Sequence, residues 1–135
     1  MRTRTTRAGK ASGRKKAGGA GPAGRPLTGG GLAAEVRRKL GVSRKVFSRL
    51  TGFSERAIAN WESGGRPDEP GLRRIRETER FQARLAEVVE PAAIPAWLDT
   101  PNDAFGGLKP LEVIERGEID RLWNMIFYLE SGVAS

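Results

Sequence analysis

LGVSRKVFSRLTGFSERAIANWESG, residues 40–64, combines two short helical patterns with a glycine turn between them. Ser43 and Ser54 each stand before one of these patterns, where a serine oxygen can accept a hydrogen bond from a helix N-terminus. Gly52 supplies the left-handed backbone conformation that a sharp turn requires. Ser54 also directs the second helix outward, where its first residues can enter a DNA major groove. The stretch therefore predicts a helix-turn-helix whose recognition helix runs from Ser54 to about Glu62.

The apolar residues of this stretch predict a small helical core. Ser48 is small at a position where two helices cross closely, and four larger side chains are expected to face inward. These core residues are Phe47, Leu50, Ile58 and Trp61. They keep this role even if the segment is only a helical bundle with solvated surface charges.

Apolar spacing and stop signals extend the helical prediction in both directions. Leu32, Val36 and Leu40 recur at intervals of four and indicate a helix that closes at Gly41. No segment alternates apolar and polar residues over a useful length, so we expect an all-α fold without strands. Further helices are expected at about residues 70–89, 94–98, 102–105, 110–116 and 118–130.

Charge divides the chain into three parts that suggest different partners. Residues 1–31 carry eight Arg or Lys and no acidic residue, and residues 32–84 have a net charge of +6. Residues 85–135 have a net charge of −6. We therefore expect DNA to approach the N-terminal two-thirds and a basic or polar protein surface to suit the acidic third.

The same three parts suggest the domain organisation. Residues 1–31 lack the apolar side chains that could offset ordering entropy, so they are expected to form a disordered basic tail. This tail is either a solubilising segment or an arm that adds phosphate contacts; an organellar transit peptide is the least favoured reading. Residues 32–90 are expected to form the DNA-binding domain with a linking helix, and residues 91–135 a second helical module.

Composition excludes most catalytic chemistry. The chain has no Cys and no His, so it lacks disulfides, thiolate or imidazole metal ligands and a histidine acid/base relay. No apolar run approaches the roughly 18 residues of a membrane span, and no secretory signal is recognisable. We expect a cytoplasmic binding protein with no catalytic residues, metal or cofactor.

Residues 40–64, including the closing Trp-Glu-Ser-Gly, resemble the Xre family of phage-repressor-like regulators. The resemblance implies that Glu55, Arg56 and Asn60 face base edges. Arg is suited to contact guanine and Asn to contact adenine, whereas Glu55 would have to accept a hydrogen bond from the amino group of cytosine. The implied DNA-binding set is completed by residues near or flanking the phosphates, namely Arg44, Lys45, Ser54 and Ser63.

Residues 94–132 resemble the C-terminal toxin-binding domain shared by Xre, MbcA and ParS antitoxins. The resemblance is carried in order by Trp97-Leu98, Thr100-Pro101-Asn102, Phe105-Gly106-Gly107, Lys109-Pro110-Leu111-Glu112 and a last amphipathic helix closed by Gly132. Members of this family neutralise RES-domain toxins, which consume NAD, by covering the toxin active site. Some members also repress their own operon.

The last predicted helix is more apolar than one buried face requires. One stripe at helical spacing is formed by Ile119, Leu122, Ile126 and Leu129, with Trp123 and Phe127 widening it and Met125 and Tyr128 lying away from it. Of these residues, Trp123 and Ile126 are expected to belong to the core. The surplus suggests a partner interface. The candidate toxin-binding residues are Met125, Tyr128, Leu129, Ser131, Gly132 and Val133.

The sequence thus predicts an antitoxin that binds operator DNA and a cognate RES-type toxin, as a homodimer or as a hetero-oligomer with the toxin. The main alternative is a free-standing Xre-type regulator whose C-terminal module only dimerises. An enzyme that uses the carboxylates of Glu112, Glu115, Glu118 and Asp120 is the least favoured hypothesis, because these acids recur as a solvated face.

Overall fold

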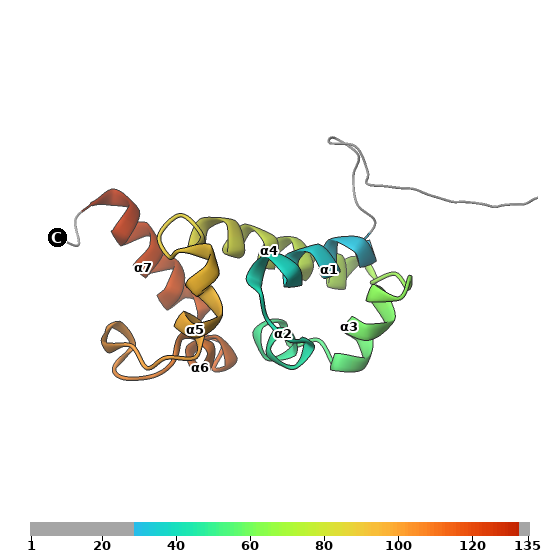
Figure 1. Cartoon of the computed structure of the whole chain (residues 1–135), viewed down its shortest axis with the longest axis horizontal. Coiled ribbons are helices and arrows are strands. Elements are labelled where there is room, and N and C mark those ends of the chain that lie inside the picture. Colours follow the sequence, from blue (N-terminus) through green and yellow to red (C-terminus); the bar gives the residue numbers. More distant parts are fainter. Residues whose placement is uncertain (1–28, 133–135) are drawn as a thin grey trace, which may run out of the picture.

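The computed structural model describes residues 29–132, and this range is helical with no strand (Figure 1). The predicted all-α fold class is confirmed. The helices are α1 Gly29–Leu40, α2 Arg44–Thr51, α3 Glu55–Glu62, α4 Glu69–Leu85, η3 Pro91–Ala93, α5 Ile94–Leu98, η4 Asp103–Phe105, α6 Pro110–Glu115 and α7 Ile119–Ser131. Within this range no helix has both the length and the apolar character of a bilayer span.

Side-chain caps start the helices where the sequence predicted them. Ser43 Oγ accepts from Val46 N at 3.1 Å, and Ser54 Oγ accepts from Ala57 N at 3.0 Å. Gly52 has a φ of 83° and ends α2, which confirms its expected place in the turn. Each cap satisfies a backbone N–H that would otherwise lack a partner.

Helix α1 begins at Gly29, three residues before the expected start at Leu32. A Cβ at Gly30 would lie 2.5 Å from the Gly65 carbonyl oxygen and 2.6 Å from the Trp61 carbonyl oxygen. The missing side chain therefore lets the first turn of α1 rest directly on the C-terminal end of α3. This contact with the recognition helix was not foreseen from the sequence.

Helix α4 joins the two halves of the molecule. Figure 1 shows α1–α3 on one side, α5–α7 on the other, and α4 running across both. One buried apolar cluster extends through both halves, from Leu32 in α1 to Ile126 in α7.

The proposed division of the chain into two domains near residue 90 stays a prediction. Of the tail predicted over residues 1–31, residues 29–31 form the start of α1 instead, and residues 1–28 lie outside the described residues, as does Val133 of the toxin-binding prediction.

Candidate functional site

The turn between α2 and α3 is held by side-chain hydrogen bonds. Thr51 Oγ1 donates to Phe47 O at 2.8 Å and accepts from Phe53 N at 3.2 Å. Ser48 Oγ donates to Phe53 O, and Arg74 Nη1 from α4 donates to Thr51 O. The backbone groups of Thr51 and Phe53 on either side of the turn are thus hydrogen-bonded to side chains. These bonds fix the orientation of α3 relative to α2 and α4.

The recognition helix buries one face and exposes the other. Ile58 and Trp61 are buried, and the Trp61 ring meets the Phe53 ring edge-on with centroids 4.7 Å apart. The face predicted to read bases is exposed to solvent. It presents Ser54, Glu55, Arg56 and Asn60.

Two arginines from different helices share the carboxylate of Glu62 at the end of α3. Arg37 of α1 donates to it through Nε at 2.6 Å and Nη2 at 3.0 Å, and Arg44 of α2 donates through Nε at 2.8 Å. These hydrogen bonds, the Arg37 bond foremost, hold the pKa of Glu62 below its usual value. Arg44 therefore has an intramolecular partner at the position predicted to flank phosphates, and Arg37 was missed because a contact 25 residues away leaves no local signal.

Two further residues of the predicted DNA-binding set also have intramolecular contacts. Ser63 Oγ donates to Ala59 O at 2.7 Å. The Asn60 carboxamide lies against Gly65, since a Cβ at Gly65 would be 2.3 Å from Asn60 Nδ2. The Ser63 side chain is thus held by a hydrogen bond, while the Asn60 side chain packs close to Gly65.

Three cations around α3 have neither an ion-pair nor a hydrogen-bond partner in the described part of the chain. Lys45 and Arg56, both predicted from the sequence, are exposed in this way. Arg66, in the loop after α3, is a third exposed cation that the sequence analysis missed. Its position just beyond the closing Gly64-Gly65 pair was the signal that could have identified it.

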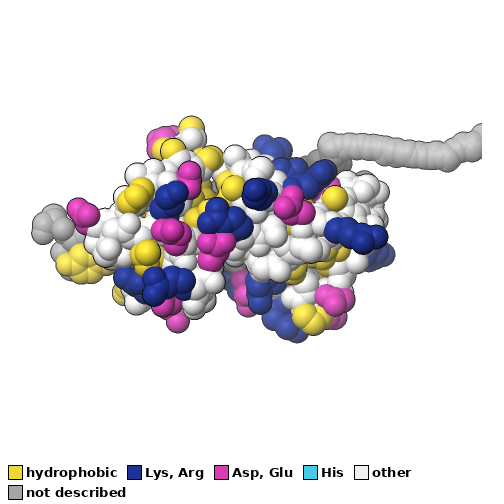
Figure 2. Space-filling model, turned by 90° about the horizontal axis from the view of Figure 1, so that it is seen from below, with side chains coloured by type: hydrophobic (Ala, Val, Ile, Leu, Met, Phe, Trp, Pro, Cys, Tyr) yellow, Lys and Arg dark blue, Asp and Glu magenta, His cyan; other side chains and the backbone are white. Residues whose placement is uncertain are grey.

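The end of α7 exposes three large side chains in a row, here called the apolar ridge. Phe127 is 73% exposed, Tyr128 52% and Leu129 43%. Figure 2 shows an apolar cluster at this end of the molecule, beside the C-terminal residues drawn in grey. Phe127 belongs to this ridge although it was not among the toxin-binding residues predicted from the sequence.

Two expectations for α7 were wrong. Phe127 does not widen the buried stripe, because the last turns of the helix project beyond the elements that cover Leu122 and Ile126. Met125 is half-buried against the core rather than directed away from it. Among the other candidate toxin contacts, Ser131 and Gly132 are exposed at the helix end.

A recess of about 400 Å³ lies beside the ridge, between η4 and α7. Tyr128 and Met125 line it from α7, and Phe105 lines it from η4. The Arg121 guanidinium lies 5.7 Å from the Phe105 ring centroid and donates to Glu118 Oε1 at 2.9 Å. The ridge and this recess together give the C-terminal half a surface with both projecting and concave apolar parts.

The acidic residues considered for catalysis are distributed among structural roles. Glu112 accepts from Lys109 N at 2.8 Å at the start of α6, and Glu115 is bonded to Arg49 at 2.6 and 2.8 Å. Glu118 pairs with Arg121, while Asp120 is exposed. In the described range, no group of three or more Asp or Glu side chains is placed to hold a metal ion.

A family comparison identifies the C-terminal half. Residues 84–122 match the family described as antitoxin Xre/MbcA/ParS C-terminal toxin-binding domain. Residues 84–122 are therefore similar to this antitoxin domain. The resemblance to this family, predicted from residues 94–132, is thereby confirmed, and the match overlaps that stretch as far as residue 122.

Relatives of known name extend this Xre/MbcA/ParS likeness over most of the chain. The mycobacterial cidal antitoxins MbcA of Mycobacterium tuberculosis and Mycobacterium bovis are 26% identical over 96 residues, which is 70% of this chain and 85% of theirs. A chain in the crystal structure of the M. tuberculosis MbcT-MbcA toxin-antitoxin complex has the same fold, with a TM-score of 0.62 and 24% identity over 77% of this chain and 95% of that one. The family and sequence matches support an antitoxin role.

Proposed function

We propose that this chain is an antitoxin that binds a cognate protein toxin through the apolar ridge at the end of α7 and the neighbouring recess. The observation that carries the proposal is the exposure of Phe127, Tyr128 and Leu129 in a row at the end of the last helix. The antitoxin acts in the cytoplasm by covering the active site of a RES-type toxin, and it performs no chemistry itself.

The energetics favour a protein partner at the ridge. Large aromatic side chains supply much of the binding free energy in protein interfaces, and each one buried contributes roughly 1.5–3 kcal/mol. The surrounding net charge of −6 in residues 85–135 suits a partner with a basic rim. A surface of this kind is unsuited to DNA, whose phosphates the acidic residues would repel.

Co-expression with the protein encoded by the adjacent gene tests this proposal. The wild-type chain should co-purify with that protein and restore the growth that it inhibits. The double variant F127S/L129S should lose both effects while keeping its helical circular dichroism, because both residues are exposed. Asp120→Asn, an exposed change on the same helix, is the control and should behave as wild type.

We further propose that α3 reads operator DNA and represses the operon. Arg56 and Asn60 both lie on the exposed face of α3, where they are accessible to base edges. Arg56 has no intramolecular partner in the described part of the chain, and Asn60 packs close to Gly65. Arg56→Ala and Asn60→Ala should each relax operator discrimination by about 1–3 kcal/mol. Arg76→Ala removes an exposed, unpaired cation on α4 and is the matched control for charge. Intact operator discrimination in the double variant would remove α3 from the interface.

The free-standing regulator is distinguished by the oligomeric state of the pure chain. If the ridge only dimerises the chain, F127S/L129S converts a dimer into a monomer and no toxin co-purifies with the wild type. In the antitoxin proposal, the ridge variant loses toxin binding whatever the oligomeric state. Sedimentation velocity and co-purification together separate these two outcomes.

A further inference from the structure

A recess between the helices lies where the two halves of the molecule meet, away from both α3 and the ridge. It has a volume of about 570 Å³, within the range of small-molecule sites. Leu50 of α2 contributes one wall, Phe81 of α4 the base, and Ile119 and Trp123 of α7 the opposite wall. We call this space the junction cleft.

The interior of the junction cleft is apolar and aromatic. The Phe81 and Trp123 rings meet edge-on at 5.7 Å between centroids, with Phe81 buried and Trp123 half-buried. Gly117 forms part of the lining, and a Cβ placed there would meet nothing within 4 Å. The cleft therefore has room for a flat apolar body against an aromatic floor.

The rim of the cleft has one available positive charge. Arg74 already donates to Thr51 O and lies 3.8 Å from Glu77. Arg80, one and a half turns further along α4, is exposed and has no ion-pair or hydrogen-bond partner in the described part of the chain. With Arg74 and Glu77 offsetting each other, the rim carries a net charge of +1 from Arg80.

We propose that the junction cleft binds a small aromatic monoanion, with its ring system against Phe81 and Trp123 and its carboxylate or sulfonate group at Arg80. Volume, apolar walls and a single polar anchor are the combination typical of small-molecule sites, which favour the junction of structural units. The proposal is independent of toxin or operator binding.

The test compares two probes that differ only in charge. 1-Anilinonaphthalene-8-sulfonate has an aromatic body and one sulfonate, and N-phenyl-1-naphthylamine has the same body without it. In calorimetric and fluorescence titrations, the full chain should bind the sulfonate at one site. Arg80→Gln should weaken sulfonate binding about fivefold and leave the uncharged probe unchanged.

Two controls locate the site. Arg76→Gln removes an equally exposed and unpaired cation of α4 that does not line the cleft, and it should bind the sulfonate as wild type. In nuclear magnetic resonance spectra, the indole N–H of Trp123 should shift on binding, while those of Trp61 and Trp97 should not. The probe should also bind F127S/L129S unchanged.

Several results would overturn the proposal. They are equal weakening by Arg76→Gln and Arg80→Gln, probe binding that disappears in F127S/L129S, and no saturable binding at millimolar probe. A Trp123 signal that stays constant while the probe binds would also overturn it, because the probe would then occupy another surface.

Discussion

At Gly30 the first turn of α1 meets the carbonyl oxygens of Trp61 and Gly65, which leave no room for a side chain. Helix propensity alone predicts that Gly30→Ala stabilises the protein. The close approach predicts instead that Gly30→Ala destabilises the protein, because the atoms that a Cβ would meet belong to the backbone and cannot easily move aside. We expect a loss of about 1–3 kcal/mol in the free energy of unfolding, measured by urea denaturation.

Lys39→Ala is the control for this substitution, since Lys39 is exposed near the other end of the same helix. It should change the free energy of unfolding by less than about 0.5 kcal/mol. A Gly30→Ala protein as stable as wild type would show that α1 does not rest on the end of α3.

The ionisation of Glu62 should make the free energy of unfolding depend on pH in the acid range. Its two arginine partners lower its pKa in the folded state, so its contribution is complete above the usual pKa of a glutamate, about 4.3. As pH falls below that value, the contribution declines, and it is lost once pH has passed the lowered pKa of the folded state.

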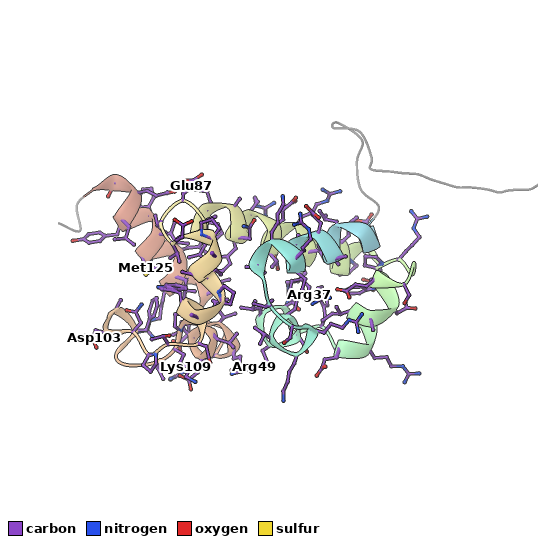
Figure 3. All side chains as sticks on the ribbon, in the orientation of Figure 1. Arg37, Arg49, Glu87, Asp103, Lys109 and Met125 are labelled. Atoms are coloured by element: carbon purple, nitrogen blue, oxygen red, sulfur yellow. The ribbon has the colours of Figure 1, made fainter. Side chains whose placement is uncertain are left out.

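Glu62→Gln should therefore have a flatter dependence of unfolding free energy on pH between about 5 and 2, measured by urea denaturation at each pH. Asp120→Asn removes an exposed carboxylate and should leave the acid dependence of wild type. Equal slopes for Glu62→Gln and wild type would contradict the ion pairs of Glu62 with Arg44 and with Arg37, which is labelled in Figure 3.

Single residues show where sequence reasoning succeeded and where it did not. Leu32, Val36 and Leu40 follow helical spacing and are buried as predicted. Phe127 follows an apolar pattern equally well but is exposed. Periodicity identifies a face of a helix, but whether another element covers that face depends on the length and packing of its neighbours.

Among the elements, α3 depends on its N-terminal cap. Ser54 Oγ accepts from Ala57 N, so Ser54→Ala should cost about 1 kcal/mol of stability. Ser63→Ala at the other end of α3 removes only an exposed side-chain bond to Ala59 O and should cost less than about half as much. Thermal unfolding followed by circular dichroism would compare the two, and equal losses would show that the cap has no special importance.

Helix positions were largely predictable, and helix ends were less so. Helix α5 has the predicted bounds, α6 ends one residue earlier than predicted, and α7 begins and ends one residue later than predicted. Helix α4 ends at Leu85 instead of Val89, because the next residues form tighter bonds such as Val88 N to Leu85 O at 3.0 Å. Apolar residues continue to Val89, so spacing alone could not locate this end.

At the scale of the whole molecule, one apolar cluster serves both halves. We expect a single cooperative unfolding transition, in which far-ultraviolet circular dichroism and tryptophan fluorescence give the same midpoint. Trp61 reports on α3 and Trp123 on α7, so the two halves are both observed. Separate midpoints for variants retaining only one of these tryptophans would show that the halves unfold independently.

The charge division read from the sequence has a second role in the folded molecule. Arg49 of α2 pairs with Glu115 of α6 (Figure 3), and Arg84 of α4 pairs with Glu130 of α7. Both pairs join a cation of the basic part to an acid of the acidic part. Composition predicted the charge of each part, but only the fold shows that these opposite charges meet.

The Arg49–Glu115 pair is more than one-third exposed on both sides, so its coupling free energy should be only about 0.2–1 kcal/mol. A double-mutant cycle with Arg49→Gln and Glu115→Gln measures it. A coupling above 2 kcal/mol would contradict the solvent screening expected at this exposure.

If α3 reads operator DNA as proposed, the continuous core through α4 also constrains how copies of this protein can be arranged along that DNA. Because α3 and the ridge belong to one packed body, a toxin on the ridge would stand at a constant offset from the groove that α3 occupies. Two bound copies would then face the same side of the duplex only if their half-sites were separated by whole helical turns, about 10–10.5 base pairs each. Inserting about half a turn between the half-sites would place the two bound toxins on opposite sides of the DNA.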